Sequence, residues 1–255
     1  MRREALISFA VLILLWQVMS LFFPAYLVPG VQEIARKFIE LLASPRAWQA
    51  IALTVARILG GLAIGFAVGL ALGAAMGLSR TVETYAKPIL HFIMGVPALC
   101  WTIVAIIWFA NIEVRVLFVM LVVAFPVFTI QILDAIHSVQ KDLSDMLLAF
   151  RPTQRQYFLK LIVPTIVPAA LTAWKVNLGY GARVEIVAEL VGASVGVGNS
   201  LLRAQELFDM GLVIAWTLVL SFFLLVGEWV LGRLEVVLLA WRPSTHQSGG
   251  LMERL

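Results

Sequence analysis

The sequence has very few of the residues on which disulfides, metal sites and most enzyme active sites depend. Its 255 residues include one cysteine and three histidines, and only 13% of them are charged. A single cysteine excludes a disulfide within the chain, and because Cys100 lies in an apolar run we expect it to serve packing. No nucleophile is paired with a base, so we expect no enzyme activity. No metal site is predicted either, because the histidines lack the spacing of zinc ligands: His91, His137 and His246.

The sequence also lacks G-x-x-x-x-G-K-[ST], the glycine-rich loop with which many proteins bind nucleotide phosphates. We therefore expect no cofactor in this chain, and any energy that its work requires must come from a partner subunit or an ion gradient. The pI is 9.5, but no stripe of basic residues alternates with exposed aromatic residues. Nucleic acid is therefore not an expected partner.

Apolar residues dominate what is present, since 62% of the residues are hydrophobic and the mean hydropathy is +0.97. A helix needs about 20 apolar residues to cross a bilayer. The sequence therefore predicts an all-α, polytopic membrane protein with six transmembrane helices, in one domain over residues 1–255 with its core at about 47–240. We expect the first apolar run to be a retained anchor helix. The six runs lie near 5–23, 49–78, 88–110, 114–136, 162–190 and 211–240.

The basic residues between the runs predict the orientation. If both termini are cytoplasmic, ten Lys and Arg residues flank the runs on the cytoplasmic side and five flank them on the other. Cytoplasmic loops of membrane proteins carry such an excess. We therefore expect a multi-pass protein of the bacterial cytoplasmic (inner) membrane, in contact with lipid, with both termini and the loop 137–161 inside the cell.

Five glycines recur at strict four-residue spacing in the second run. Residues four apart share one helix face, so this stripe removes the side chains from that face and lets another helix approach closely. Tight packing within the subunit and a sliding or dimer contact are both compatible with it. The glycines are Gly61, Gly65, Gly69, Gly73 and Gly77.

Two prolines, Pro97 and Pro126, interrupt the third and fourth runs. Proline is tolerated in membrane helices where neighbouring groups or water satisfy the carbonyl groups that it frees. Bent helices beside a cavity and kinks that serve packing alone are both compatible with these positions.

Charged residues inside the runs are the best indicators of function, since each costs at least ~2.5 kcal/mol at mid-bilayer unless it is paired or hydrated. The fifth run is too polar to face lipid, so we expect it to line the bundle interior or a watery path. Lys175 fits a substrate path and a structural ion pair equally. In the second run, Arg57 is expected to extend outward to the membrane surface. In the sixth, pairs within the helix or at its end are expected for Glu228, Arg233 and Glu235. The predicted path residues are Lys175, Asn177, Gly179, Arg183, Glu185 and Glu189.

A polar interval at 137–161 separates the fourth and fifth runs. Pro152 ends a first helix in it, and Thr153-x-x-Gln156 is a capping box that starts a second short helix. An apolar stripe on a helix in water is expected to dock into a partner. Lying flat on the membrane and folding back on the bundle are the alternatives. The stripe falls at i, i+3, i+4 and i+7: Leu143, Met146, Leu147 and Phe150.

In this interval Asp145-Met146-Leu147 is followed by Arg151, and then by Ile162-Val163-Pro164 and Pro168. The order resembles the cytoplasmic signature of permeases of ATP-binding-cassette importers: Glu-Ala-Ala, a glycine four residues after the second alanine, and a hydrophobic-Leu-Pro turn. Asp, Met, Leu and Arg stand here in place of the Glu, the two Ala and the Gly.

Other segments resemble the branch of that family that serves nitrate, taurine and alkanesulfonates, and the similarity covers about Leu27 to Trp241. These segments are Val96-Pro97-Ala98, Ile107-Trp108-Phe109-Ala110, Phe125-Pro126-Val127 and Val187-Ala188-Glu189-Leu190.

The resemblance implies a type I importer fold and a permease subunit that forms the path for a small anion such as nitrate, a sulfonate or taurine. It also implies a second permease subunit in a homodimer, two ATPase subunits that bind ATP and Mg, and an external solute-binding protein. The alternative is a self-contained secondary transporter or channel, which explains the intramembrane charges but leaves the loop helix pair without a purpose. The expected contacts to the ATPase are Leu143, Asp145, Met146, Leu147, Phe150 and Arg151.

Overall fold

The structure, a computed structural model, describes residues 3–139 and 141–240, and every regular element in these ranges is helical. Among the described residues, five helices are long and apolar enough to cross a membrane, and the bent pair α4 (Arg80–Gly95) and α5 (Ala98–Trp108) brings the number to six when it is counted as one span. The prediction of an all-helical, polytopic membrane protein is therefore confirmed, with five or six candidate spans. The helices are α1 (Arg3–Ser20), α2 (Val31–Ala43), α3 (Pro45–Leu78), α4 (Arg80–Gly95), α5 (Ala98–Trp108), α6 (Ile112–His137), α7 (Lys141–Ala149), α8 (Gln154–Tyr157), a π turn (Phe158–Ile162), α9 (Val163–Gly192), α10 (Val197–Glu206) and α11 (Met210–Leu238).

The third predicted span, 88–110, is not one continuous helix, because α4 and α5 meet at a bend of 93°. Pro97 explains the break, since its ring disfavours helical backbone at the preceding residue. Val96 is indeed extended, with φ −83° and ψ 124°. Pro126, in contrast, lies inside α6, which continues without a break.

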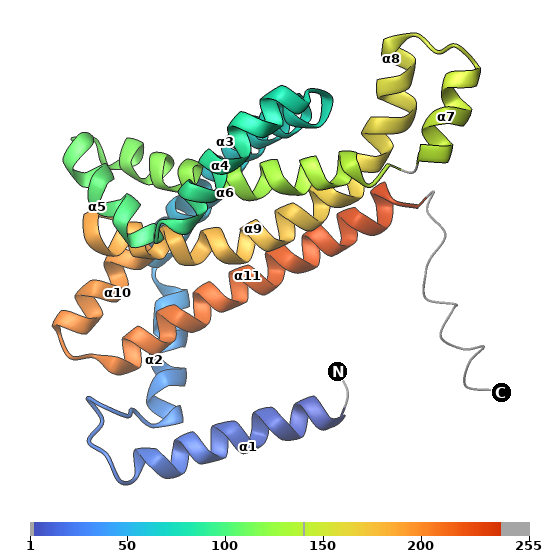
Figure 1. The fold of residues 1–255 in the computed structure, drawn as a ribbon. Helices are drawn as coiled ribbons and strands as arrows, with labels where there is room; N and C mark the ends of the chain where they lie inside the picture. Colours follow the sequence, from blue (N-terminus) through green and yellow to red (C-terminus); the bar gives the residue numbers. More distant parts are fainter. Residues whose placement is uncertain (1–2, 140, 241–255) are drawn as a thin grey trace.

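The centre of the bundle is formed by α3, α6 and α9, with α5 packed against them. The main buried cluster includes Leu62, Met120, Phe128 and Ala182, none of which has any exposed surface. In Figure 1, α11 runs beside α9, and α10 lies at the opposite end of the bundle from α7 and α8. The start of α1 and the end of α11 lie on the same side as α7 and α8 (Figure 1).

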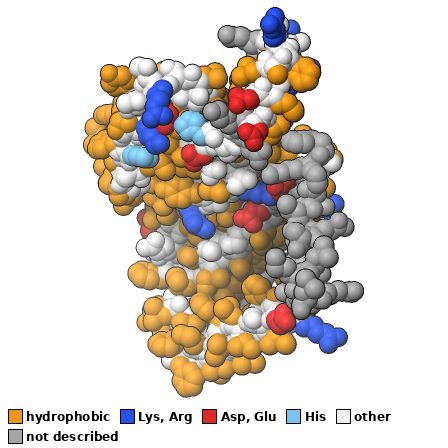
Figure 2. Space-filling model, turned by 45° about the vertical axis from the view of Figure 1, so that its right-hand side comes forward, with side chains coloured by type: hydrophobic (Ala, Val, Ile, Leu, Met, Phe, Trp, Pro, Cys, Tyr) orange, Lys and Arg blue, Asp and Glu red, His pale blue; other side chains and the backbone are white. Residues whose placement is uncertain are grey.

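Hydrophobic side chains cover much of the surface, as the face in Figure 2 shows, while charged side chains gather mainly toward the end that carries α7 and α8. None of the described residues of α1 is buried, and α11 exposes Phe222, Leu225 and Trp229. Such continuous apolar surface is typical of helices that face lipid or another subunit. Cys100, which we expected to be packed, is exposed, because α5 buries only Thr102 and Ala105.

A salt bridge joins α2 to the start of α11. Lys37 pairs with Asp209, the N-cap residue of α11, whose carboxylate also accepts a hydrogen bond from the N–H of Leu212 at 3.0 Å. Burial alone would raise the pKa of Asp209. The hydrogen bonds from Lys37 and Leu212 and the positive charge of Lys37 outweigh burial and hold that pKa below its usual value.

Candidate functional site

The glycine stripe of α3 packs against α6 within the subunit. A Cβ atom added to Gly69 would lie 2.5 Å from Cβ of Phe128 and 2.9 Å from the carbonyl oxygen of Phe125. Because the stripe carries no side chains, the two helices approach closely, and this geometry favours packing within the subunit over a contact between subunits. The other stripe glycines, Gly61, Gly65, Gly73 and Gly77, meet α6 at Met120, Ala124, Ile132 and Ile136.

Glu189 of α9 is the centre of a buried hydrogen-bond network. Its carboxylate accepts hydrogen bonds from the Thr54 hydroxyl at 2.8 and 2.9 Å, from Nη1 of Arg57 at 2.7 Å and from the N–H of Gly198 at 2.8 Å. The side chain of Glu189 is fully buried. Charge-assisted hydrogen bonds to both oxygens compensate for the loss of water, so the network ties α3 and α10 to α9.

Arg57 does not extend to the membrane surface, which corrects the expectation from the sequence. Only 6% of its side chain is exposed, and besides Glu189 it binds Glu113 of α6. Its Nη2 atom lies 2.5 Å from Oε1 of Glu113, and its Nε atom lies 2.9 Å from Oε2. The planar guanidinium group therefore meets both carboxylate oxygens, which makes the pair strong. Both carboxylates lie within hydrogen-bonding distance of Arg57, and these contacts hold its side chain inside the bundle.

Two glycines allow the chain to pass directly over Glu189. Gly196 has φ 146°, a conformation that other residues rarely adopt, and a Cβ atom there would collide with the Glu189 carboxylate. A Cβ atom on Gly198 would lie 2.6 Å from Cβ of Glu189. Thr54 and Glu113 were not predicted as members of this network, although the Gly196-x-Gly198 pair indicates a close approach of the backbone.

Three of the six predicted path residues are buried inside the subunit. Asn177, Glu185 and Glu189 are at most 1% exposed. Since α9 turns this face toward the centre of the bundle, the three side chains lie in the bundle interior rather than on a face that is open to water. Oδ1 of Asn177 and both carboxyl oxygens of Glu185 are buried without a hydrogen-bond partner among the described residues.

The other three predicted path residues lie toward the surface. Lys175 pairs with Glu235 of α11, so Glu235 bonds to another helix rather than within its own. Gly179 is half-buried, with open space where a Cβ atom would lie. Arg183 is exposed, and it has no hydrogen-bond or ion-pair partner within residues 3–139 and 141–240.

The bend in the third span forms a pocket beside the exposed face of α9. This pocket holds about 170 Å³ and includes Tyr180 of α9. Its other lining residues come from the bend and from α6: Ile93, Met94, Val96, Val122, Val123 and Val127. The exposed face of α9 is defined by side chains that recur every three or four residues: Thr172, Val176, Tyr180 and Arg183.

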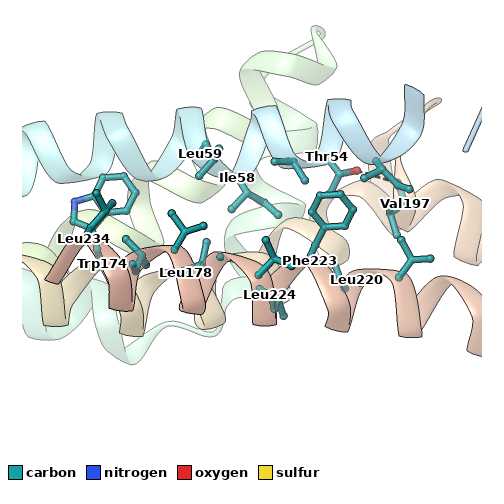
Figure 3. Close-up of a pocket in the computed structure, with 17 residues that line it drawn as sticks. Thr54, Ile58, Leu59, Trp174, Leu178, Val197, Leu220, Phe223, Leu224 and Leu234 are labelled. Carbon is teal, nitrogen blue, oxygen red and sulfur yellow. Dashed lines mark hydrogen bonds between the residues drawn. The ribbon is translucent and has the colours of Figure 1, made fainter. Parts of the chain in front are cut away.

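A larger groove of about 430 Å³ runs between α3 and α11, with Trp174 and Leu178 of α9 also in its lining (Figure 3). Its walls are aliphatic and aromatic except at Thr54, whose hydroxyl already donates to Glu189. A charged solute would find no partner in this groove.

The segment 137–161 forms two short helices that project from one end of the bundle (Figure 1). The predicted capping box is formed, since the N–H of Thr153 donates to Oε1 of Gln156 at 2.9 Å and the N–H of Gln156 donates to Oγ1 of Thr153 at 3.3 Å. The hydroxyl groups of Ser144 and Tyr157 lie 3.0 Å apart and join α7 to α8.

The apolar stripe of α7 is displayed rather than covered by the described chain. Leu143, Met146 and Phe150 are 45%, 58% and 79% exposed, and Leu147 is half-buried. Asp145 is exposed beside them. Such a stripe at the end of a helical bundle is typical of a docking element for another protein.

Arg151 follows α7 with φ 48°, which is the left-handed region that favours glycine. The importer signature has glycine at the position that matches Arg151. The backbone at Arg151 therefore has the left-handed conformation that glycine adopts most easily.

Residues 64–236 match the family described as "Binding-protein-dependent transport system inner membrane component", and the chain belongs to this family. It is 27% identical over 243 residues to the formylaminopyrimidine transport permease protein of Halalkalibacterium halodurans, covering 94% of this chain and 96% of that one. It is 29% identical over 238 residues to a putative aliphatic sulfonates transport permease protein of Bacillus subtilis, covering 92% of this chain and 86% of that one. The chain is therefore a permease of an importer of the ATP-binding-cassette class, in the branch that includes aliphatic sulfonate permeases.

A solved structure has the same fold. It is that of the MetNI methionine ABC transporter in inward-facing conformations, and the TM-score is 0.59 at 18% sequence identity. The match covers 73% of this chain and 91% of that one.

Proposed function

We propose that this chain, paired with a second copy of itself, forms the translocation path for a small organic or inorganic anion such as a sulfonate, taurine or nitrate. An external binding protein delivers the solute at the end of the bundle that carries α10. Two ATPase subunits, which bind ATP and Mg, contact α7 in the cytoplasm. The permease itself binds no nucleotide, in keeping with the missing phosphate loop.

The observation that carries this proposal is the exposed apolar stripe of α7. This stripe enters a groove on the ATPase, which removes an apolar surface from water. Its residues are Leu143, Met146, Leu147 and Phe150. At the rim of that groove, polar contacts come from Asp145 and Arg151. A movement of the ATPase is thereby transmitted through α8 and the π turn into α9.

The orientation of the chain in the membrane is proposed from the side on which α7 and α8 lie. We place α7 and α8 in the cytoplasm, because basic residues are in excess on that side. The start of α1 and the end of α11 lie on this side too (Figure 1), which supports our proposal that both termini are cytoplasmic. Three of the basic residues behind the orientation lie outside the described residues: Arg2, Arg242 and Arg254.

An anionic solute is supported by Arg183 on the exposed face of α9, a basic side chain with no partner in the described chain. We assign the path to this face, with Gly179 giving it room and Lys175 at its cytoplasmic end. The relative named for aliphatic sulfonates agrees with an anion. Another relative is named for formylaminopyrimidine, so the names of the relatives do not point to one solute. The positive charge of Arg183 supports an anionic solute more directly than these names do.

Co-purification with the cognate ATPase tests the docking of α7. Met146→Asp places a charge in the stripe and should strip the ATPase from the complex, while leaving the permease inserted and dimeric on size-exclusion chromatography. Leu148→Asp is the matched control, because Leu148 is exposed on the same helix but off the stripe. It should retain the ATPase. Full ATPase association and transport with Met146→Asp would show that α7 is not the coupling element.

A further inference from the structure

We propose that Glu185 of α9 is a proton-binding site inside the bundle: its carboxyl group is neutral in this conformation and gives up its proton when water reaches it. The inference does not depend on the solute or on the ATPase. It makes any movement that parts the helices around Glu185 depend on pH.

The first argument is the burial of the Glu185 side chain. It has no exposed surface, and neither carboxyl oxygen has a hydrogen-bond partner among the described residues. A carboxylate taken out of water without a partner is so costly that the group takes up a proton instead. The buried residues of α9 on either side of it, Ala182, Val184 and Ala188, belong to the main apolar cluster. These neighbours cannot replace water around a negative charge.

The second argument is that the nearby cation already has its partners. Among the described residues, the charged groups that act electrostatically on Glu185 are Arg57 of α3, Glu113 of α6 and Glu189 of α9. Nε and Nη2 of Arg57 donate to Glu113. Its Nη1 donates to Glu189 and to the carbonyl oxygen of Val195. One positive charge therefore faces two carboxylates, and repulsion disfavours a third negative charge beside them.

The third argument is the contrast between Glu185 and Glu189, which stand four residues apart and so share one face of α9. Both side chains are fully buried. Glu189 accepts hydrogen bonds from a guanidinium group, a hydroxyl group and a backbone N–H, whereas Glu185 accepts none from the described residues. Two neighbouring carboxyl groups commonly hold one proton between them. The contacts make Glu189 the carboxylate of this pair and Glu185 the acid.

The site lies where three helices are held together. The ion pair between Arg57 and Glu189 joins α3 to α9, and the N–H of Gly198 joins α10 to the same carboxylate. A movement that parts these helices lets water reach Glu185, and a glutamic acid in water ionises above about pH 4.3. The proton then passes to the solvent. A higher pH therefore favours the parted arrangement.

Infrared difference spectroscopy tests the charge state of Glu185. The full-length chain is purified at pH 7 in a detergent without ester groups, and the spectrum of Glu185→Gln is subtracted from that of the parent. The difference should show the carbonyl band of a neutral carboxylic acid. Glu206→Gln is the control, because Glu206 is exposed on α10, and its difference spectrum should show a carboxylate band only. Glu185→Met, which removes the polar group altogether, should give the same acid band as Glu185→Gln.

Thermal unfolding tests whether the folded chain holds the proton. Between pH 5 and pH 8 the unfolded chain has an ionised Glu185 and the folded chain a neutral one, so unfolding of the parent releases a proton that Glu185→Gln lacks. The folding equilibrium constant of the parent should therefore fall by about tenfold per pH unit relative to that of Glu185→Gln as pH rises. The melting temperature of the variant should gain on that of the parent over this range. The gap between the parent and Glu206→Gln should stay constant.

Two results would overturn the site. One is a carboxylate band, instead of an acid band, in the difference spectra of Glu185→Gln and Glu185→Met. The other is a gap in melting temperature between Glu185→Gln and the parent that does not change from pH 5 to pH 8. Either would mean that Glu185 is ionised in the folded chain. Met146→Asp can still strip the ATPase in that case, and the importer assignment then stands without the proton site.

Discussion

The Nη1 atom of Arg57 lies 2.7 Å from Oε1 of Glu189, and both side chains are withdrawn from solvent. This ion pair joins α3 to α9 beneath the turn that leads into α10, where Gly196 and Gly198 make room for the carboxylate. A buried ion pair is weak as a source of net stability, but losing one partner leaves the other uncompensated. The pair therefore acts as a specific clamp between the two helices.

Arg57→Met should destabilise the protein by ~3–5 kcal/mol, because Glu189 is then buried as a charge without its cation. The melting temperature of the detergent-solubilised protein measures this. The double variant Arg57→Met/Glu189→Met removes both charges and should recover much of the loss, while Glu113 tolerates the change because 53% of its side chain is exposed. A double variant no more stable than Arg57→Met alone would contradict a clamp based on charge.

Gly69→Ala should lower the melting temperature, because its Cβ atom would lie 2.5 Å from Cβ of Phe128 and force α3 away from α6. The expected cost is about 1–3 kcal/mol. Gly60→Ala is the matched control in the same helix, since nothing lies within 4 Å of a Cβ atom there. It should be neutral or should stabilise by up to about 1 kcal/mol through helix propensity. Equal effects at the two positions would mean that the stripe does not determine the packing.

Arg151→Gly should stabilise the turn after α7, because φ 48° costs a side-chain-bearing residue about 1–2 kcal/mol. Amide hydrogen exchange of α7 and α8 should slow, and ATPase stimulation should stay equal or rise. Arg155→Gly provides the contrast, since Arg155 lies in α8 and glycine disfavours a helix by about 1 kcal/mol. Faster exchange in Arg151→Gly than in the parent would show that the left-handed turn is not strained.

The Lys37–Asp209 salt bridge should make stability depend on pH. The pKa of Asp209 is lowered in the folded protein, so its contribution is present above the ordinary value of 3.8 and is lost as pH falls through the folded value. Asp209→Asn can still cap α11 but cannot pair with Lys37. Its melting temperature should lie below that of the parent at pH 6, and the gap should begin to close as pH falls below about 3.8. A gap that stays constant from pH 6 to pH 3 would rule out an ionised Asp209 as its cause.

Local features of this protein were determined by the sequence alone. Six apolar runs specified the spans, because crossing a bilayer requires length and hydrophobicity that any window of sequence displays. The capping box at Thr153 and Gln156 was equally readable, since its hydrogen bonds connect residues three positions apart. The glycine stripe of α3 indicated one bare helix face, although not which helix would cover it.

Only the tertiary structure decided which charges meet and which helix faces are exposed. Arg57 binds Glu113 and Glu189, which lie 56 and 132 positions away in the sequence. The rotation of each helix about its own axis determines which of these side chains meet. The rotation of α9 buries Glu185 and Glu189 and exposes Arg183, although all three stand in the same polar run. Such rotations follow from the packing of all the helices together, since each buried face must fit its neighbours, and no single segment contains that information.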